Sequence, residues 1–214
     1  MNVLVVGATG KTGRFIIPLL KAAGHTPRAM IRNFDQREEM EALGAECVAG
    51  DLEKPMGHAV KGNWTVLFAA GSGSSTGPEK TIEVDFHGAI SLIETSERMN
   101  VRRFIMLSAM NTDDPDSGPE NLQHYLHAKA GADARLRLSL MNWTIVRPGY
   151  LHDEPSHELL GVAPSFGPID KNMRVSREDV AKVMVACMAL DNTIGKTFDM
   201  IDGKTPMLEA LESL

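Results

Sequence analysis

Residues 1–14 read M-N-V-L-V-V-G-A-T-G-K-T-G-R, and this stretch decides the fold. The segment 2–6 is a run of apolar, mostly β-branched residues that do not alternate with polar ones, which is typical of a strand buried on both faces. Gly7, Gly10 and Gly13 follow at steps of three, and apolar residues then recur at helical spacing. The glycines are therefore predicted to form a strand-to-helix turn.

A glycine turn between a buried strand and a helix favours the binding of a dinucleotide. Glycine allows a tight bend and a close approach of the backbone to a ligand. The first turn of the helix offers unpaired N–H groups and the positive end of its dipole to a phosphate. The spacing G-x-x-G-x-x-G differs by one residue from the commonest dinucleotide fingerprint, so a glycine turn without a ligand remains the alternative.

The composition is that of an ordinary globular protein. The chain is 43% hydrophobic and 23% charged, and its 214 residues suit one domain or two small ones. The net charge of −6 does not favour nucleic acid or an anionic membrane as a partner. Cys47 and Cys187 lie far apart in the sequence and are expected to be reduced thiols. With no apolar leader and no run of about 20 apolar residues, we expect a cytoplasmic protein.

Strand and helix patterns alternate along the chain. Strands are expected at 2–6, 26–31, 45–49, 65–70, 103–107, 143–146 and 196–201. Helices are expected from residue 12 to a stop at Gly24 and then near 36–43, 55–60, 79–99, 122–140 and 177–190. The alternation predicts one α/β domain, 1–214, with a doubly wound parallel sheet of the Rossmann type. Residues 150–173 contain three prolines and are expected to be irregular, with 151–175 forming a substrate loop or lid.

The residues that follow the second and third strands bear on the choice of cofactor. NAD-binding domains place an acid after the second strand to bond the ribose 2′-hydroxyl, whereas this chain has Arg32 there. A guanidinium favours a 2′-phosphate, which predicts NADP(H). Arg37 is expected to help, and Lys11 or Arg14 to reach a phosphate. A solvated surface arginine is the alternative. Asp51 is expected near the adenine or, equally, as a loop-capping residue.

Ser108, Tyr125 and Lys129 form a candidate catalytic set. Y-L-H-A-K places Tyr125 and Lys129 four residues apart on one helix face, and Ser108 ends a strand beside that helix. A nearby ammonium is expected to lower the pKa of the tyrosine, which could then exchange a proton with a carbonyl or alcohol oxygen. The alternative is a half-buried tyrosine with a snorkelling lysine. No His/Cys set or H-E-x-x-H motif is present, so no metal is expected.

The chain resembles the short-chain dehydrogenases/reductases over nearly its whole length. The motifs G-A-T-G-K-T-G-R, G-D-L, F-A-A-G-S, V-D-F-H-G-A-I-S-L-I-E, F-I-M-L-S-A-M, Y-L-H-A-K-A and T-I-V-R-P-G occur in the order of that family. The closest likeness is to its atypical NAD(P)-binding branch, whose small members are sugar-epimerase-like or flavin- and biliverdin-reductase-like.

The resemblance implies a set of cofactor contacts. On the pyrophosphate it places Gly7, Thr9, Gly10, Lys11 and Thr12, with Gly13 in the same turn. Along the adenosine half it places Arg32, Asp51, Leu52, Ala69, Ala70 and Gly71. Lys129 would bond the nicotinamide ribose and Pro148 would lie beside the nicotinamide.

Two features depart from that family. Asp85 stands where many active members carry an asparagine that takes part in a lysine–water proton relay. The resemblance therefore does not extend to this relay. The chain after Tyr150 is too short for the substrate domain of sugar-nucleotide epimerases, so a bulky nucleotide sugar is not expected.

The leading functional prediction is an NADP-dependent oxidoreductase that transfers hydride between nicotinamide and a small carbonyl, alcohol or flavin-like substrate. A non-catalytic NADP-sensing regulator is the main alternative, and a small epimerase- or dehydratase-like enzyme is a third. The expected partners are a small-molecule substrate and, at most, a second copy of the chain, since a monomer or homodimer is anticipated.

Overall fold

A nine-stranded sheet runs through the molecule, in a computed structural model that describes residues 1–73 and 76–214. Its order is β11-β8-β10-β6-β5-β4-β1-β2-β3, and a separate pair joins β7 to β9. The strands are β1 (Asn2–Val6), β2 (Thr26–Ile31), β3 (Glu46–Ala49), β4 (Thr65–Phe68), β5 (Arg103–Leu107), β6 (Asn142–Pro148), β7 (Tyr150–His152), β8 (Leu159–Ala163), β9 (Arg174–Ser176), β10 (Lys196–Asp202) and β11 (Thr205–Pro206). All neighbours pair in parallel except β8, which is antiparallel to β10 and β11.

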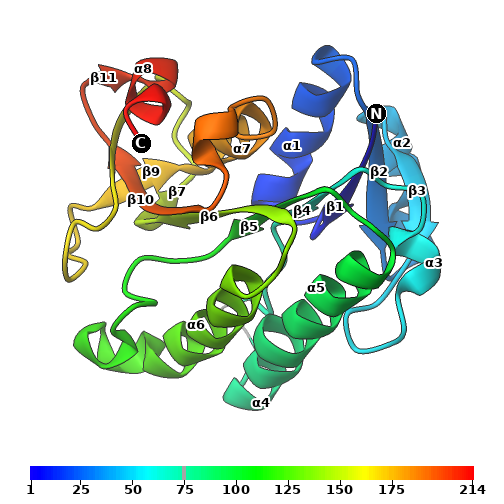
Figure 1. Cartoon of the computed structure of the whole chain (residues 1–214), viewed down its shortest axis with the longest axis horizontal. Coiled ribbons are helices and arrows are strands. Elements are labelled where there is room, and N and C mark those ends of the chain that lie inside the picture. The colour runs from blue at the N-terminus through cyan, green and yellow to red at the C-terminus, as the bar shows by residue number, and fades with distance from the viewer. Residues whose placement is uncertain (74–75) are drawn as a thin grey trace.

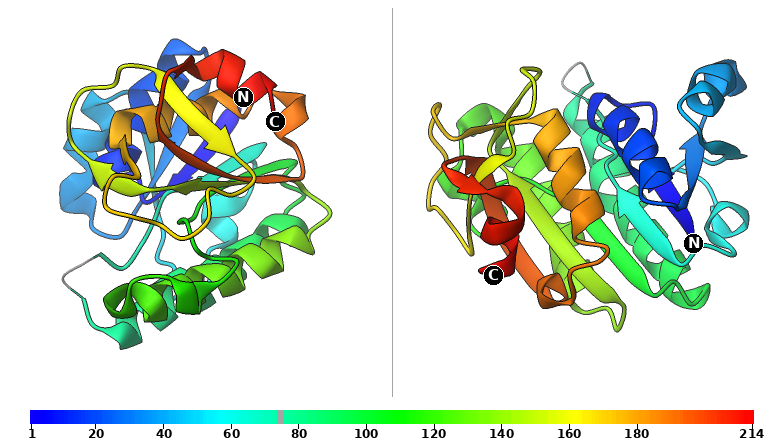
Figure 2. Two further views of the ribbon diagram at one scale, coloured as in Figure 1. Left: turned by 90° about the vertical axis from the view of Figure 1, so that its left-hand side faces the viewer. Right: turned by 90° about the horizontal axis from the view of Figure 1, so that it is seen from above.

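Helices cover both faces of this sheet. They are α1 (Lys11–Ala22), α2 (Arg37–Ala42), α3 (Gly57–Val60), α4 (Pro78–Thr81), the π-helix η2 (Ile82–Gly88), α5 (Ala89–Arg98), α6 (Gln123–Arg137), α7 (Arg177–Ala186) and α8 (Met207–Glu212), with short 3₁₀ turns at Phe34–Gln36, Pro115–Ser117, Glu120–Leu122 and Asp191–Thr193. Figure 1 shows α1 and α7 on one side of the sheet and α4, α5 and α6 on the other, and Figure 2 shows the same layers from two further directions. The doubly wound α/β fold predicted from the alternating pattern is confirmed.

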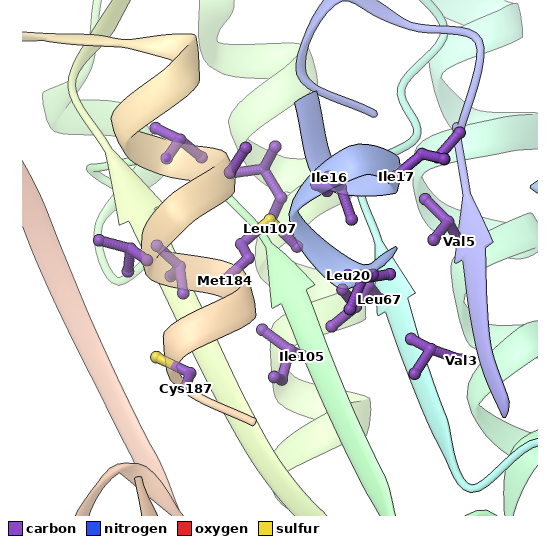
Figure 3. Packing of buried hydrophobic residues seen from close by; sticks show 14 of the residues in the cluster. Val3, Val5, Ile16, Ile17, Leu20, Leu67, Ile105, Leu107, Met184 and Cys187 are labelled. Atoms are coloured by element: carbon purple, nitrogen blue, oxygen red, sulfur yellow. The ribbon is translucent and has the colours of Figure 1, made fainter. Parts of the chain in front are cut away.

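The core explains why β1 reads as an uninterrupted apolar run. Val3 and Val5 belong to the cluster under α1 and α7, whereas Leu4 and Val6 belong to the cluster under α5 and α6. Figure 3 shows the first cluster, in which side chains of the sheet meet Leu20 of α1 and others of α7. Because consecutive residues of a strand point to opposite faces, a strand covered on both faces carries apolar residues at every position.

The segment predicted to be irregular contains more regular structure than expected. Residues 150–173 hold β7 and β8, and β8 joins the main sheet beside β10. The three prolines at 155, 164 and 168 all lie outside these strands. The expectation that residues 150–173 are irregular was therefore wrong, because short strands anchor this stretch to the sheet edge. That 151–175 forms a substrate loop or lid stays a prediction.

The long helix expected at 79–99 is present but changes its winding. It begins as α4, continues as the π-helix η2 and ends as α5. The wider π turn brings Asp85 to a fully buried position. Such turns are rare inside helices and occur frequently at functional sites.

Two further local features concern the ends of helices and their length. Ser176 caps α7, since its hydroxyl accepts a hydrogen bond from the Asp179 backbone N–H at 2.9 Å. Within residues 1–73 and 76–214, none of the helices combines the length and the apolar character that crossing a lipid bilayer requires.

Candidate active site

The glycine turn between β1 and α1 is as tight as the sequence predicts. Gly7 has a φ of +85°, and a Cβ placed there would lie 2.5 Å from the backbone nitrogen of Ala70. A Cβ at Gly13 would lie 2.1 Å from the carbonyl oxygen of Gly7. Both distances are far below van der Waals contact, so a larger residue at either position would open the turn.

The first turn of α1 has the features of an anion site. Its N-cap is Gly10, with no side-chain cap, and the first turn contains no acidic residue. The N–H groups at this end are therefore left without a side-chain acceptor, and the helix dipole adds positive potential to them. A dinucleotide pyrophosphate fits this set of donors, because it is an anion with several acceptor oxygens.

A cavity of about 330 Å³ lies in front of this turn, along the carboxyl ends of β4, β1, β2 and β3. Among its lining residues are nine of the predicted cofactor contacts: Gly7, Thr9, Gly10, Arg32, Asp51, Leu52, Ala69, Ala70 and Gly71. Sequence analysis missed further lining residues, which are Val6, Met30, Gln36, Gly50, Ser72, Thr76, Lys80 and Val84. The strand-end rule therefore brings the residues expected along the adenosine together at one cavity but does not find the helix residues that close it. That they contact an adenosine stays a prediction.

Arg32 is a cation at the β2 end of the cavity that no carboxylate of the described residues engages. It is exposed, it lines the cavity, and it makes no ion pair with any residue in the described part of the chain. Its neighbours are already engaged, because Arg14 pairs with Glu39 and Arg37 pairs with Glu41. The guanidinium of Arg32 is thus free to meet an anionic ligand in this cavity.

Three residues of the predicted pyrophosphate set lie outside this cavity. Thr12 and Gly13 are buried under the turn. The Lys11 ammonium pairs with Asp153 at 2.6 Å, and the same carboxylate pairs with Arg177 at 2.5 Å. Asp153 therefore bridges the glycine turn to α7 from the 151–175 segment, a contact between residues more than 140 positions apart that no local pattern indicates.

A second cavity of about 240 Å³ continues along the same edge of the sheet, where β5 and β6 end. Ser108, Tyr125 and Pro148 all line it, together with Tyr150 and Arg177. Ser108 directly follows β5 and Pro148 is the last residue of β6, so the order of the strands brings them together. The hydroxyl of Tyr125 has no hydrogen-bond partner among residues 1–73 and 76–214. The expected meeting of Ser108 with Tyr125 at a single cavity is therefore present.

Lys129 is buried, is not among the residues that line the second cavity, and faces a carboxylate. Its side chain is 1% exposed, and its Nζ lies 3.9 Å from Oδ1 of Asp85, which is itself fully buried. The other carboxylate oxygen of Asp85 accepts a hydrogen bond from the Ser72 backbone N–H at 2.9 Å. Burial lowers the pKa of the Lys129 ammonium, while Asp85 and Asp133 oppose that effect. Lys129 thus faces the carboxylate of Asp85, at the position where many active members of the resembled family carry an asparagine.

The pKa of Tyr125 moves opposite to the direction that we expected from Lys129. Burial raises the pKa of the phenol, and the nearby carboxylates Asp85 and Asp133 raise it further. The ammonium of Lys129 is not among the causes of this shift, so it does not lower the pKa of the phenol as expected. Tyr125 consequently holds its proton at neutral pH and acts as a hydrogen-bond donor.

The hydroxyl of Ser108 is already engaged on the protein side. It donates a hydrogen bond of 2.7 Å to Oδ2 of Asp133, and Thr112 donates to the same oxygen at 2.9 Å. Asp133 is fully buried on α6. Burial raises the pKa of its carboxyl, against the hydrogen bond from Ser108 and the charge of Lys129, which lower it.

Sequence analysis missed Asp133, although a signal for it exists. It lies four residues after Lys129 and eight after Tyr125, on the same face of one helix. A search for further polar residues at that spacing would have found it. Thr112, in contrast, comes from the loop after β5, and only the tertiary structure brings it to Asp133.

The chain is similar to several known proteins over its full length. It is 38% identical to the uncharacterized sugar epimerase YhfK of Bacillus subtilis, covering 100% of both chains. Among solved structures, a candidate NAD-dependent epimerase/dehydratase from Bacillus halodurans superposes with a TM-score of 0.96 at 45% identity, covering 100% of both chains. The oxidoreductase ylbE from Lactococcus lactis superposes with a TM-score of 0.84 at 27% identity, covering 100% of this chain and 96% of that one.

The sequence profile of the NAD(P)H-binding family matches residues 7–191, a range that begins at the glycine turn and contains every residue that lines the two cavities except Val6. The chain therefore belongs to the NAD(P)H-binding family, with oxidoreductase- and epimerase-like proteins as its relatives.

Proposed function

We propose that the protein is an NADP(H)-dependent oxidoreductase acting on a small carbonyl, alcohol or flavin-like substrate. The observation that carries this proposal is the arrangement of two cavities along one edge of the sheet. The first ends at the free guanidinium of Arg32, and the second holds the hydroxyls of Ser108 and Tyr125. A cofactor in the first cavity and a substrate in the second would meet where β4 and β5 end side by side.

Arg32 supports NADP(H) over NAD(H). No acidic residue lies at the end of β2 to accept a hydrogen bond from a ribose 2′-hydroxyl, since Ile31 and Asn33 flank the arginine. A 2′-phosphate would receive charge-assisted hydrogen bonds from the guanidinium, which a hydroxyl cannot match. The uncapped start of α1 would hold the pyrophosphate in either cofactor, so it does not discriminate between them.

The side chains of the second cavity would bind and orient a substrate oxygen. When bound, the nicotinamide supplies the hydride donor or acceptor. Tyr125 retains its proton and would donate a hydrogen bond to the substrate oxygen, where it would stabilise negative charge that develops there. Lys129 and Pro148 are proposed to support the nicotinamide half of the cofactor. The cavity volume suits a small substrate better than a nucleotide sugar.

Transfer of a deuterium label tests this proposal directly. Purified protein is incubated with NADPH deuterated at C4 of the nicotinamide and with a panel of aldehydes, ketones, quinones and flavins. We expect consumption of NADPH with at least one class, and deuterium on carbon in the product when that class is the aldehydes or the ketones, because the hydrogens of reduced quinones and flavins exchange with water. Tight binding of NADPH without consumption by any member of the panel would contradict the proposal and favour an NADP-sensing protein.

An epimerase is the second candidate, and the names of two similar proteins favour it. In such a reaction the hydride would return to the substrate, so cofactor would be used but not consumed. Conversion of a sugar or hydroxy-acid substrate at a constant NADPH concentration would select this candidate over the oxidoreductase.

The Asp153 bridge leads to a prediction about cofactor binding. Asp153 holds Lys11 and Arg177, and the pyrophosphate of a cofactor would compete with it for Lys11. Asp153→Asn should therefore tighten NADPH binding modestly and make the affinity fall more steeply with salt concentration, because the freed cations attract the pyrophosphate through a screened charge–charge interaction. Calorimetric titration at two salt concentrations measures both effects. Weaker binding by the variant would show that the bridge orders the site instead of competing for it.

A further inference from the structure

A buried carboxyl group lies directly behind the second cavity. Asp133 is on α6, one turn after Lys129 and two turns after Tyr125, and its side chain has no exposed surface. Its Oδ2 accepts hydrogen bonds from Ser108 at 2.7 Å and from Thr112 at 2.9 Å. Its Oδ1 has no hydrogen-bond partner in the described part of the chain. A buried carboxyl with a free oxygen is costly to keep charged, which marks the group for a role beyond packing.

The contact with Asp133 decides what Ser108 can offer to a ligand. A serine hydroxyl has one hydrogen, and that hydrogen points to Asp133. Ser108 Oγ therefore presents only lone pairs to the cavity and can accept a hydrogen bond from a ligand. Tyr125, which keeps its proton, can donate one. The two groups together complement an alcohol, whose oxygen accepts from Tyr125 while its hydrogen is donated to Ser108.

We propose that Asp133 is the proton-holding group of this site and acts on the substrate through Ser108, a step that rests on the proposed oxidoreductase function. In alcohol oxidation the substrate O–H bond breaks and its proton bonds to Ser108 Oγ, while the hydrogen of Ser108 passes to Asp133 Oδ2. Oxidised nicotinamide of a cofactor held by the first cavity would supply the acceptor for the hydride that leaves the carbon, so that the carbonyl could form. Carbonyl reduction runs the same transfers backward. Asp133 is a positioning residue, because it never touches the substrate.

The charges around Asp133 give the direction of the pH dependence. The positive charges of Lys129 and Arg137, both on α6, favour the charged form of Asp133, whereas burial opposes it. On the other side of the Lys129 ammonium lies the carboxylate of Asp85, from η2. Burial dominates, so the carboxyl takes up a proton at a higher pH than an exposed aspartate does. Oxidation needs the carboxylate and should rise with pH through that pKa. Reduction needs the neutral carboxyl and should fall over the same range.

A spectroscopic titration tests the protonation states without any substrate. The chain has two tyrosines, so Tyr150→Phe leaves Tyr125 as the only one, and its ionisation is followed by ultraviolet absorbance. We expect Tyr125 to ionise above its ordinary pKa of 10.0 and to ionise at lower pH when Asp133→Asn is added. A phenolate at neutral pH would overturn the proposal by making Tyr125 the base. An unshifted titration in the double variant would show that Asp133 carries no charge beside it.

The pH profile of turnover tests the relay itself, with a substrate identified by the deuterium panel. Asp133→Asn keeps an oxygen acceptor for Ser108 but cannot take up a proton. The Asp133→Asn variant should lose the change of turnover with pH that the Asp133 carboxyl causes, here called the pH-dependent limb. Its turnover should be slower by about 10²-fold or more, with NADPH affinity unchanged. Thr112→Val is the matched control, because it removes the other hydrogen bond to Asp133 and should keep the limb. An unchanged profile in Asp133→Asn overturns the relay alone, whereas absence of turnover in the parent overturns the proposed function as well.

Discussion

Replacement of Tyr125 by phenylalanine is expected to lower turnover about 10²–10³-fold, the loss typical of removing one donor to a developing oxyanion. The phenol lines the second cavity and keeps its proton, so it is available to donate to a substrate oxygen. Phenylalanine fills nearly the same volume and lacks only the hydroxyl. The dissociation constant of NADPH should therefore hardly change. Steady-state kinetics and calorimetric titration of the same preparation measure the two effects separately.

The neighbouring position on α6 supplies the control for this substitution. His124 is exposed and lines neither of the two cavities, so His124→Ala should leave turnover near the parent rate. A Tyr125→Phe variant that works at the parent rate would mean that the hydroxyl of Tyr125 has only a structural role.

Arg32→Ala is expected to remove most of the preference for NADPH over NADH. A hydrogen bond to a charged group contributes roughly 1.5–3 kcal/mol, and about 1.4 kcal/mol corresponds to a tenfold change in affinity. Loss of the guanidinium should therefore weaken NADPH binding at least about tenfold and leave NADH binding nearly unchanged. Calorimetric titration of both cofactors into the variant measures the ratio of the two dissociation constants.

Arg37→Ala is the matched control for the Arg32 variant. Arg37 lies nearby on α2, but it pairs with Glu41, lies over the ring of Phe34 and does not line the cofactor cavity. It should keep the preference for NADPH. If Arg32→Ala keeps the preference for NADPH, or if Arg37→Ala loses it, Arg32 is not the residue that recognises the 2′-phosphate.

The parallel core of the fold could be predicted because its signals are local. A strand such as β1, buried on both faces, is a short apolar run, and Gly7 follows it at a position that only glycine fits without strain. The segment 150–173 could not be predicted in the same way. Its strand β8 depends on antiparallel pairing with β10, some forty residues later in the chain, and short strands with long-range partners have no periodic pattern of their own.

The candidate site likewise contains residues that local sequence signals predict and features that only the tertiary structure determines. Ser108 and Arg32 each follow a parallel strand, and the strand-end rule therefore predicts that they lie at the ligand edge. The protonation of Tyr125 could not be predicted, because it depends on the burial of the phenol and then on the charges of Asp85 and Asp133 rather than on the spacing of Lys129. The Asp153 bridge also depends on tertiary structure alone.

Calorimetric titration of NADPH and of NADH into the unmodified protein tests the central claim most directly, because it needs no substrate. The free guanidinium of Arg32 and the absence of an acid in the sequence beside it predict that NADPH binds at least about tenfold more tightly than NADH. Equal dissociation constants, or tighter binding of NADH, would contradict the account of an NADP(H)-dependent site.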